Sequence, residues 1–166
     1  MIRRAGRDHA GEQVHRLAAS LQVPRPWRLE TFIEHVCERV GKPIVLIPQP
    51  DLADGSFPCG LVLERADNIV VTYDATSSGY HADHIVLHEI AHLLLDHAGL
   101  VSPQSKSRTL QTLFPDIDAD SVLRVLARTD YDDAHESQAE LFASLILSDT
   151  VGARSTSFLA RAIFRD

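Results

Sequence analysis

The sequence predicts a single α+β domain, in which a small, mostly antiparallel, three-stranded sheet packs against helices. Its length of 166 residues suits one domain, and a hydrophobic content of 45% is enough to form a core. Apolar residues recur at helical spacing toward both ends of the chain, and short runs of strand-forming residues lie between them. This order, with the strands grouped together, is typical of α+β domains.

Two helices are expected before the first strand. Residues 8–21 carry a weak amphipathic pattern, and residues 1–27 are assigned to a helical N-terminal extension of the single domain, which spans residues 1–166. A stronger apolar stripe covers residues 29–40, and Gly41 is a typical helix stop.

Three strands should follow these helices. Residues 44–47 form a short apolar run, and residues 60–64 and 68–73 form two more runs that only three residues separate. That spacing is typical of a hairpin, so the last two strands should pair antiparallel.

Two longer helices are expected after the strands, one from about residue 80 to residue 97 and one from about residue 133 to residue 147. Residues 98–131 between them are interpreted as a loop or flap insertion. The reason is that residues 102–115 are polar and bounded by prolines.

Two short helices complete the expected order. One covers residues 120–128, where Asp120 or Ser121 can cap the first turn. The other covers residues 157–164 near the end of the chain.

Composition and charge exclude several classes of protein. The net charge of −7 and a pI near 5.7 argue against direct binding to nucleic acid or to an anionic membrane. Cys37 and Cys59 are too few for a disulfide framework or a zinc knuckle. The N-terminal residues contain no hydrophobic signal-peptide region, and His88, Glu89 and His92 interrupt the longest apolar stretch. We therefore expect a cytoplasmic protein without a membrane span.

The most informative motif is His-Glu-Ile-Ala-His at residues 88–92. Two histidines at positions i and i+4 lie on one face of a helix and can share a metal ion. Catalytic zinc takes three protein ligands and leaves a fourth position for water, on which Glu89 can act as general base. The plainer interpretation is a pair of core histidines. However, the flanking apolar residues predict a buried helix, where unpartnered histidines would be costly.

A third ligand must come from elsewhere in the chain. A longer zinc motif would place glycine and a further ligand at Leu95 and Ala98, so that pattern does not apply. His97 follows His92 by five residues and is interpreted as a surface or C-terminal-turn histidine.

Two glutamates on the expected helix at residues 133–147 are the remaining candidates. Glu136 and Glu140 are spaced i and i+4, so they share one helix face. An acidic pair of this kind is commonly a solvated surface. Here it lies beside Ala139, Phe142 and Ala143, on the flank that should approach the core. The residues leave open which of the two glutamates is the ligand.

Together these residues resemble the ImmA/IrrE family of zinc metallopeptidases, which pairs HExxH with a downstream E-x-x-A-[ND]-x-F-A helix. The resemblance covers residues 68–97 and 133–148. It implies a zincin-like fold, His88 and His92 as zinc ligands, Glu136 as the third ligand and Glu89 as the catalytic base. Glu140 departs from the family pattern, which has Asn or Asp at that position.

The resemblance also implies a function. We expect an endopeptidase that hydrolyses a peptide bond in a regulatory protein through zinc-bound water, with Glu89 as general base. The substrate implied is a helix-turn-helix transcriptional repressor on a separate chain. Mn²⁺ or Fe²⁺ would also fit two histidines and a carboxylate. The alternative is a non-catalytic zinc-containing regulator or binding module for a partner protein, although the presence of Glu89 favours the enzyme.

Two further expectations concern the substrate. The strand before the HExxH helix, at residues 69–73, should hold an extended peptide as an added strand. Several side chains could stabilise the oxyanion of the reaction, and the sequence favours none of them. These candidates are Tyr73, Tyr80, Tyr131, His84 and His135.

Overall fold

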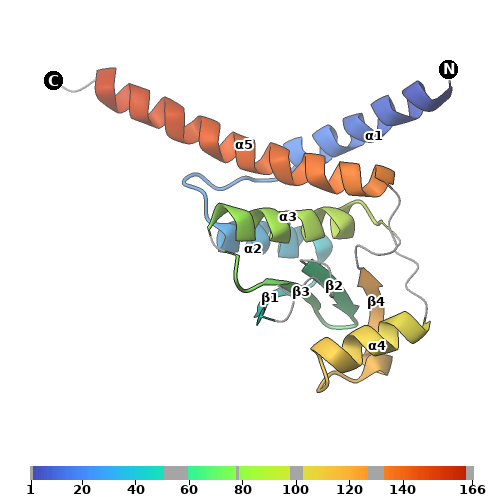
Figure 1. Cartoon of the computed structure of the whole chain (residues 1–166). Helices are drawn as coiled ribbons and strands as arrows, with labels where there is room; N and C mark the ends of the chain where they lie inside the picture. Colours follow the sequence, from blue (N-terminus) through green and yellow to red (C-terminus); the bar gives the residue numbers. More distant parts are fainter. Residues whose placement is uncertain (1, 51–59, 78, 98–102, 127–132, 164–166) are drawn as a thin grey trace.

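The computed structural model describes residues 2–50, 60–77, 79–97, 103–126 and 133–163 (Figure 1). Helices α1 (Ile2–Ala19) and α2 (Leu29–Val40) precede strands β1 (Ile44–Gln49), β2 (Gly60–Arg65) and β3 (Ile69–Asp74). Helices α3 (Tyr80–Leu94) and α4 (Pro103–Leu113), strand β4 (Val122–Leu126) and helix α5 (Asp133–Ile163) follow. The α+β class predicted from the sequence is confirmed.

The sheet has the strand order β1-β3-β2-β4. Strand β2 pairs antiparallel with both β3 and β4, and the pairing with β3 confirms the hairpin predicted from the short separation of these two strands. Strand β1 runs parallel to β3, with Ile44 opposite Ile69. The described sheet is therefore mixed and has four strands, whereas we expected three.

The strand that the sequence missed is β4. We expected a helix at residues 120–128, but only a 3-10 turn forms at Ala119–Ser121, where the Asp118 carboxylate accepts a hydrogen bond from the Asp120 amide. The following apolar residues then pair with β2, with Val125 opposite Leu63. A Val-Leu-x-Val-Leu run fits a helix or a strand, and the available partner strand decided between them.

The predicted peptide-binding strand is also wrong. Strand β3 lies between β1 and β2 and is hydrogen-bonded to both along its length. A strand with two partners has no edge to offer to an extended peptide.

Two helices differ from the sequence prediction. Residues 103–113 form helix α4, where we expected part of a loop or flap; its polar sequence still places Leu110 and Leu113 on a buried face. Residues 98–102 and 127–131 of that insertion lie outside the described residues. Helix α5 runs without interruption through Ile163, whereas we expected one helix ending near residue 147 and another at residues 157–164. Neither proline nor any other obligatory break lies between those segments.

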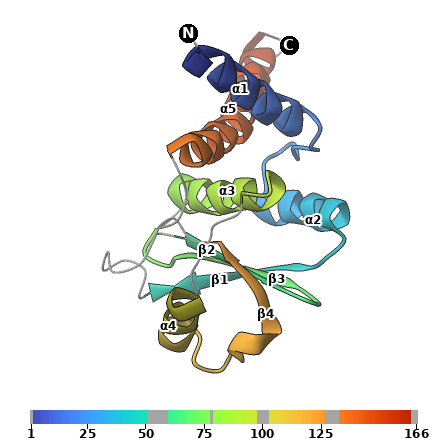
Figure 2. The same cartoon turned by 90° about the vertical axis from the view of Figure 1, so that its right-hand side faces the viewer.

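The elements form layers on the two faces of the sheet (Figure 2). Helices α2 and α3 cover one face, and α1 and α5 lie beyond them (Figures 1 and 2). A large core on this side joins β2 and β3 to α3 and α5, through residues such as Val62, Val71, Ile90 and Phe142. On the opposite face, α4 packs against the sheet in a second, smaller core that includes Leu61 and Leu63 of β2 and Val125 of β4. No helix among the described residues is long and apolar enough to cross a bilayer.

Polar contacts hold both ends of α3. Near its start, the Trp27 indole nitrogen donates a hydrogen bond of 2.7 Å to the Asp83 carboxylate. After its end, the Arg124 guanidinium on β4 donates to Asp96 at 2.6 Å and to Glu64 at 2.8 Å. Because α3 carries the HExxH motif, these contacts orient the candidate site.

Candidate metal centre

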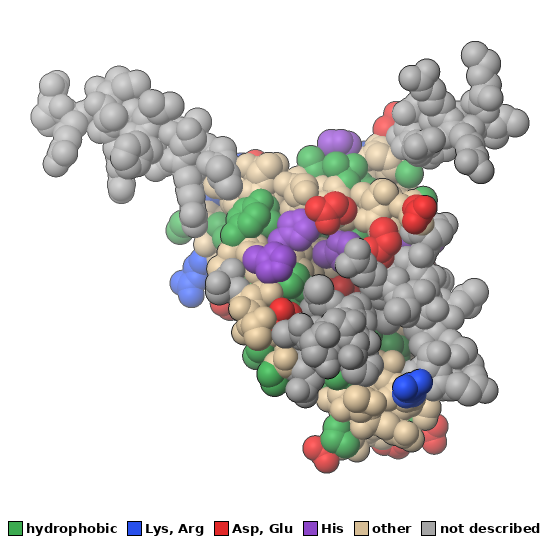
Figure 3. Space-filling model, viewed as in Figure 1, with side chains coloured by type: hydrophobic (Ala, Val, Ile, Leu, Met, Phe, Trp, Pro, Cys, Tyr) green, Lys and Arg blue, Asp and Glu red, His purple; other side chains and the backbone are tan. Residues whose placement is uncertain are grey.

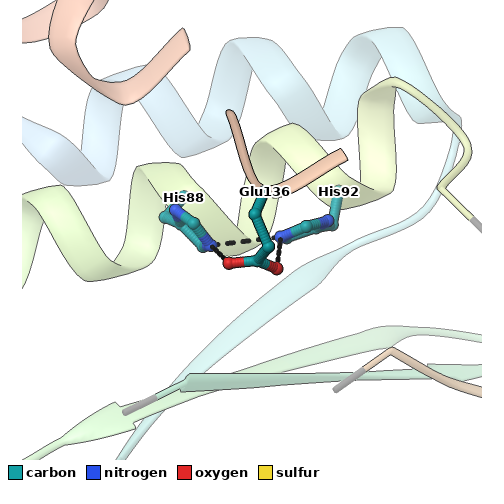
Figure 4. Close-up of side chains that lie close together, drawn as sticks. All are labelled: His88, His92 and Glu136. Carbon is teal, nitrogen blue, oxygen red and sulfur yellow. Dashed lines mark hydrogen bonds and ion pairs between the residues drawn. The ribbon is translucent and has the colours of Figure 1, made fainter. Parts of the chain in front are cut away.

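Two helices bring three potential metal ligands together (Figure 4). His88 and His92 come from α3, and Glu136 comes from the first turn of α5. The two Nε2 atoms lie 3.1 Å apart. The Glu136 carboxylate faces both, with Oε2 at 3.5 Å from His88 Nε2 and Oε1 at 3.4 Å from His92 Nε2. These three donors form the only such group of histidine, cysteine and acidic side chains within the described part of the chain.

The spacing of these donors fits a tetrahedral zinc ion. With metal–ligand bonds of about 2.0–2.2 Å, neighbouring ligand atoms of a tetrahedron lie about 3.3–3.6 Å apart. The observed separations of 3.1, 3.4 and 3.5 Å are close to these edges. Two Nε2 atoms that face each other at this distance also require a proton or a cation between them, since two lone pairs would repel.

The electrostatic environment keeps His92 able to bind a metal. Its side chain is only 1% exposed, and burial lowers the pKa of His92 from 6.5 to about 3. Repulsion from the neighbouring His88, His97 and His135 lowers this pKa further in the same direction. His92 is therefore neutral at physiological pH, and only a neutral imidazole offers a lone pair to a metal.

The two candidate glutamates occupy different places. Glu136 is 24% exposed and faces the Nε2 atoms of both histidines. Glu140 is 60% exposed and lies on the other side of His88, with Oε2 at 3.8 Å from its Nδ1 atom. Its Oε1 atom is 3.2 Å from His84 Nε2. The structure thus brings Glu136, rather than Glu140, into the group of three donors.

Glu89 is buried between α3 and the sheet, at 4% exposure. Its side chain packs against the start of β2, where a Cβ atom added to Gly60 would come within 2.6 Å of Glu89 Cγ and Oε1. Glycine at residue 60 therefore leaves the space that the Glu89 carboxylate occupies.

His97 is not the surface residue that we expected. It is 4% exposed, and its Nδ1 atom lies 3.0 Å from His92 Nδ1. Asp96 follows the end of α3 in a left-handed conformation (φ 52°), and the backbone amides of Asp96 and His97 donate to the carbonyls of Leu93 and His92. This Schellman turn reverses the chain and returns the His97 ring to His92.

Sequence reasoning also missed Gln138. Its Oε1 atom lies 3.1 Å from His97 Nε2, across an interval of 41 residues. No local pattern connects these two positions. The only sequence signal near this contact was the pair Asp96-His97, which follows directly after the apolar residues at the end of α3.

The candidates for oxyanion stabilisation are scattered. Tyr80 is 58% exposed at the start of α3. His84 contacts Glu140, and the His135 ring stacks on His97 at a centroid distance of 4.3 Å. Tyr73 is partly buried against the large core, and Tyr131 lies outside the described residues, as does Cys59.

Histidine and acidic side chains gather on one face of the molecule, over α3 and the beginning of α5 (Figure 3). Comparisons with protein-family models, with curated proteins and with solved structures each gave no match to this chain. The ImmA/IrrE resemblance therefore depends on the motif residues, and the geometry of the site is the independent support for a metal centre.

Proposed function

We propose that this chain is a zinc-dependent endopeptidase with a zincin-like active site, similar to the ImmA/IrrE metallopeptidases. The observation that carries the proposal is the convergence of His88, His92 and Glu136 at the spacing of a tetrahedral zinc site. These ligands come from two helices whose nearest members are 136 − 92 = 44 residues apart in sequence. An accidental HExxH motif would not require a distant carboxylate to face both histidines.

In the proposed mechanism, different side chains bind the metal ion and transfer the proton. His88, His92 and Glu136 would hold the ion, and the two negative charges of Glu136 and Glu89 would offset its charge in a largely buried site. When bound, zinc supplies a Lewis acid that polarises a carbonyl and makes water a nucleophile near neutral pH. Glu89 takes the proton from the attacking water and delivers it to the leaving amine.

The resemblance extends the proposal to the substrate. ImmA/IrrE-like peptidases act on helix-turn-helix repressors, and we propose a repressor on a separate chain as the substrate here. The net charge of −7 supports a DNA-binding repressor on a separate chain, because an acidic protein is poorly suited to bind DNA itself. Incubating the protein with such a repressor and mapping new termini by mass spectrometry tests the substrate directly.

The first experiment measures bound zinc per chain. Wild type should hold about one zinc, Glu136→Ala should lose most of it, and Glu140→Ala should retain it. The two variants form a matched pair, since the same residue type is truncated one helical turn apart. Zinc loss only in Glu140→Ala would transfer the ligand role to Glu140. An absence of zinc in wild type after reconstitution would contradict the metal site and support the interpretation of His88 and His92 as core histidines.

A second variant separates the enzyme from a binding module. Glu89→Gln keeps a similar shape but cannot accept the proton, so cleavage should fall by at least about 10²-fold while zinc content is unchanged. Cleavage at the wild-type rate in Glu89→Gln would remove Glu89 from the mechanism. A zinc-loaded wild type that binds the repressor without cleaving it would support the non-catalytic alternative.

A further inference from the structure

His97 lies directly behind the candidate ligand His92. The Schellman turn at Asp96 places the His97 ring beside the His92 ring, at a centroid distance of 5.1 Å and an interplanar angle of 68°. Both rings are almost fully buried. The 3.0 Å separation of their Nδ1 atoms is a hydrogen-bond distance, so one ring must donate and the other accept.

The contacts continue from His97 to the N-terminal helix. His97 Nε2 lies 3.1 Å from Gln138 Oε1 on α5, and Gln138 Nε2 donates to the backbone carbonyl of Ala10 on α1 at 3.4 Å. The chain of contacts thus runs from the metal centre on α3, through α5, to α1. No step in it uses an acidic side chain, although carboxylates and backbone carbonyls are the usual partners of metal-binding histidines.

Only one direction of donation satisfies these three contacts together, from His92 to His97, from His97 to Gln138 and from Gln138 to Ala10. The Ala10 carbonyl can only accept, so the Gln138 amide must turn its NH₂ group toward it and its oxygen toward His97. That oxygen also only accepts, so a neutral His97 must carry its proton on Nε2. The Nδ1 atom of His97 is then an acceptor, and His92 must donate from Nδ1.

The consequence falls on the metal-facing side of His92. A neutral imidazole with its proton on Nδ1 has a lone pair on Nε2. This is the nitrogen that lies 3.1 Å from His88 Nε2 and 3.4 Å from Glu136 Oε1. The chain of contacts therefore prepares His92 for a metal before any metal arrives.

We propose that His97 and Gln138 are positioning residues that set the tautomer and the ring orientation of His92. The Ala10 carbonyl, which can only accept, fixes the direction of the hydrogen bonds in this series of contacts. This inference rests on the proposed zinc site and adds to it a route by which helix α1 influences metal affinity. Because the tautomer is set by the protein alone, it can be measured without metal.

Zinc affinity, from competition with a chromogenic chelator, tests His97. His97→Phe keeps an aromatic ring against His135 but offers no acceptor, and it should weaken zinc binding about 10–100-fold. His97→Asn places an oxygen near the position of Nδ1 and should restore affinity to within about threefold of wild type. His81→Phe makes the same substitution at an exposed site on α3 and should leave affinity unchanged.

Tautomers are read from long-range ¹H–¹⁵N spectra of the metal-free protein. His92 should carry its proton on Nδ1 in wild type and in His97→Asn, and should shift toward the Nε2-protonated form in His97→Phe. A merely structural role for His97 would change stability without this shift. Gln138→Leu, which removes the acceptor for His97, provides a second route to the same result if His97→Phe does not fold.

The outcomes separate this inference from the proposed function. A wild-type His92 protonated on Nε2, or His97→Phe and Gln138→Leu variants that bind zinc as tightly as wild type, would overturn the positioning role. A wild type that binds no zinc would overturn the proposed function, while the metal-free spectra would still decide the tautomer. Zinc binding with the expected tautomers but no peptidase activity would support the positioning role and reject only the enzyme.

Discussion

His88 and His92 belong to the same motif, but their surroundings differ. The His92 side chain is 1% exposed, and behind it His97 and Gln138 lead to the backbone of α1. The His88 side chain is 16% exposed, and behind it lies Glu140, a carboxylate that is 60% exposed and 3.8 Å away. Neutral groups that are buried or partly buried lie behind His92, whereas a solvated charge lies behind His88.

In the proposed zinc site, this difference implies that His88 and His92 become ligands by different routes. His92 has its lone pair on Nε2 in advance, so in the metal-free protein the hydrogen bond between the two rings must come from His88 Nε2. His88 must then move its proton to Nδ1 when a metal binds, toward Glu140. We expect the buried ligand to be preorganised and the exposed ligand to adjust.

The largest effects should come from removing each ligand. His88→Ala and His92→Ala should both weaken zinc binding by more than about 100-fold, because either leaves two protein ligands. Only His92→Ala should also lower the free energy of unfolding of the metal-free protein, by about 1–3 kcal/mol, since it leaves a cavity and removes the hydrogen bond between the His92 and His97 rings. Urea unfolding in the presence of a chelator measures this difference. Equal losses in both variants would contradict the contrast between the two sites.

The second prediction extends the comparison to Glu89, which lies between the histidines in sequence and is buried like His92. Gly60→Ala would place a methyl group within 2.6 Å of the Glu89 side chain and displace its carboxylate. We expect the proposed peptidase activity to fall by at least about tenfold, while the proposed zinc site of His88, His92 and Glu136 still binds the ion. Activity and zinc content measured on one preparation check this, with Gly11→Ala as a control at a glycine that has open space around it.

The third prediction concerns pH. Because burial lowers the pKa of His92 to about 3, the unfolded protein binds more protons than the folded protein between about pH 3 and pH 6.5. The contribution to stability is complete above pH 6.5 and is lost as the pH falls toward 3. In metal-free protein, the unfolding free energy should decrease across this window. His92→Phe should reduce the dependence of the unfolding free energy on pH, by an amount that corresponds to up to about one bound proton. Urea titrations at several pH values measure this dependence.

The smallest effect on zinc affinity should come from a change at Glu140, the exposed carboxylate beside His88. Glu140→Gln keeps the shape of the side chain and removes its charge from a solvated position near His88 and His84. Zinc affinity should change by less than about threefold, because exposed ion pairs contribute little. The same chelator competition measures it. A loss of zinc affinity as large as that of His97→Phe would show that His88 depends on Glu140 as much as His92 depends on His97.

The sequence predicts the parts of the fold and site that depend on local pattern. Helices α2 and α3 and strands β2 and β3 carry clear periodicity or turn signals, and they form close to their expected positions. The HExxH spacing places His88 and His92 on one face of α3, and the apolar stripe of α5 turns Glu136 toward them. Each of these inferences needs only the geometry of one element.

The parts that the sequence does not predict depend on tertiary partners. Strand β4 forms because β2 offers a free side to residues 122–126, and no pattern within those residues states this. Helix α4 looks polar until the second core shows which of its leucines are covered. His97 reaches His92 through a left-handed residue at Asp96, and an aspartate in that conformation gives little local signal. Gln138 becomes relevant only once α3 and α5 pack together.

The second core under the sheet has a consequence for how the molecule opens. Helix α4 buries Leu110 and Leu113 in this second core, to which β4 adds Val122 and Val125, whereas Leu126 of β4 lies in the larger core that holds α3 and α5. Helix α4 can therefore detach locally while the rest of the fold remains intact. Amide hydrogens of α4 should then exchange through this partial opening, whereas those of β3 and α3 exchange only on global unfolding. Zinc bound at the proposed site would connect α3 and α5, so adding it should slow exchange of the α3 and β3 amides and leave that of the α4 amides unchanged.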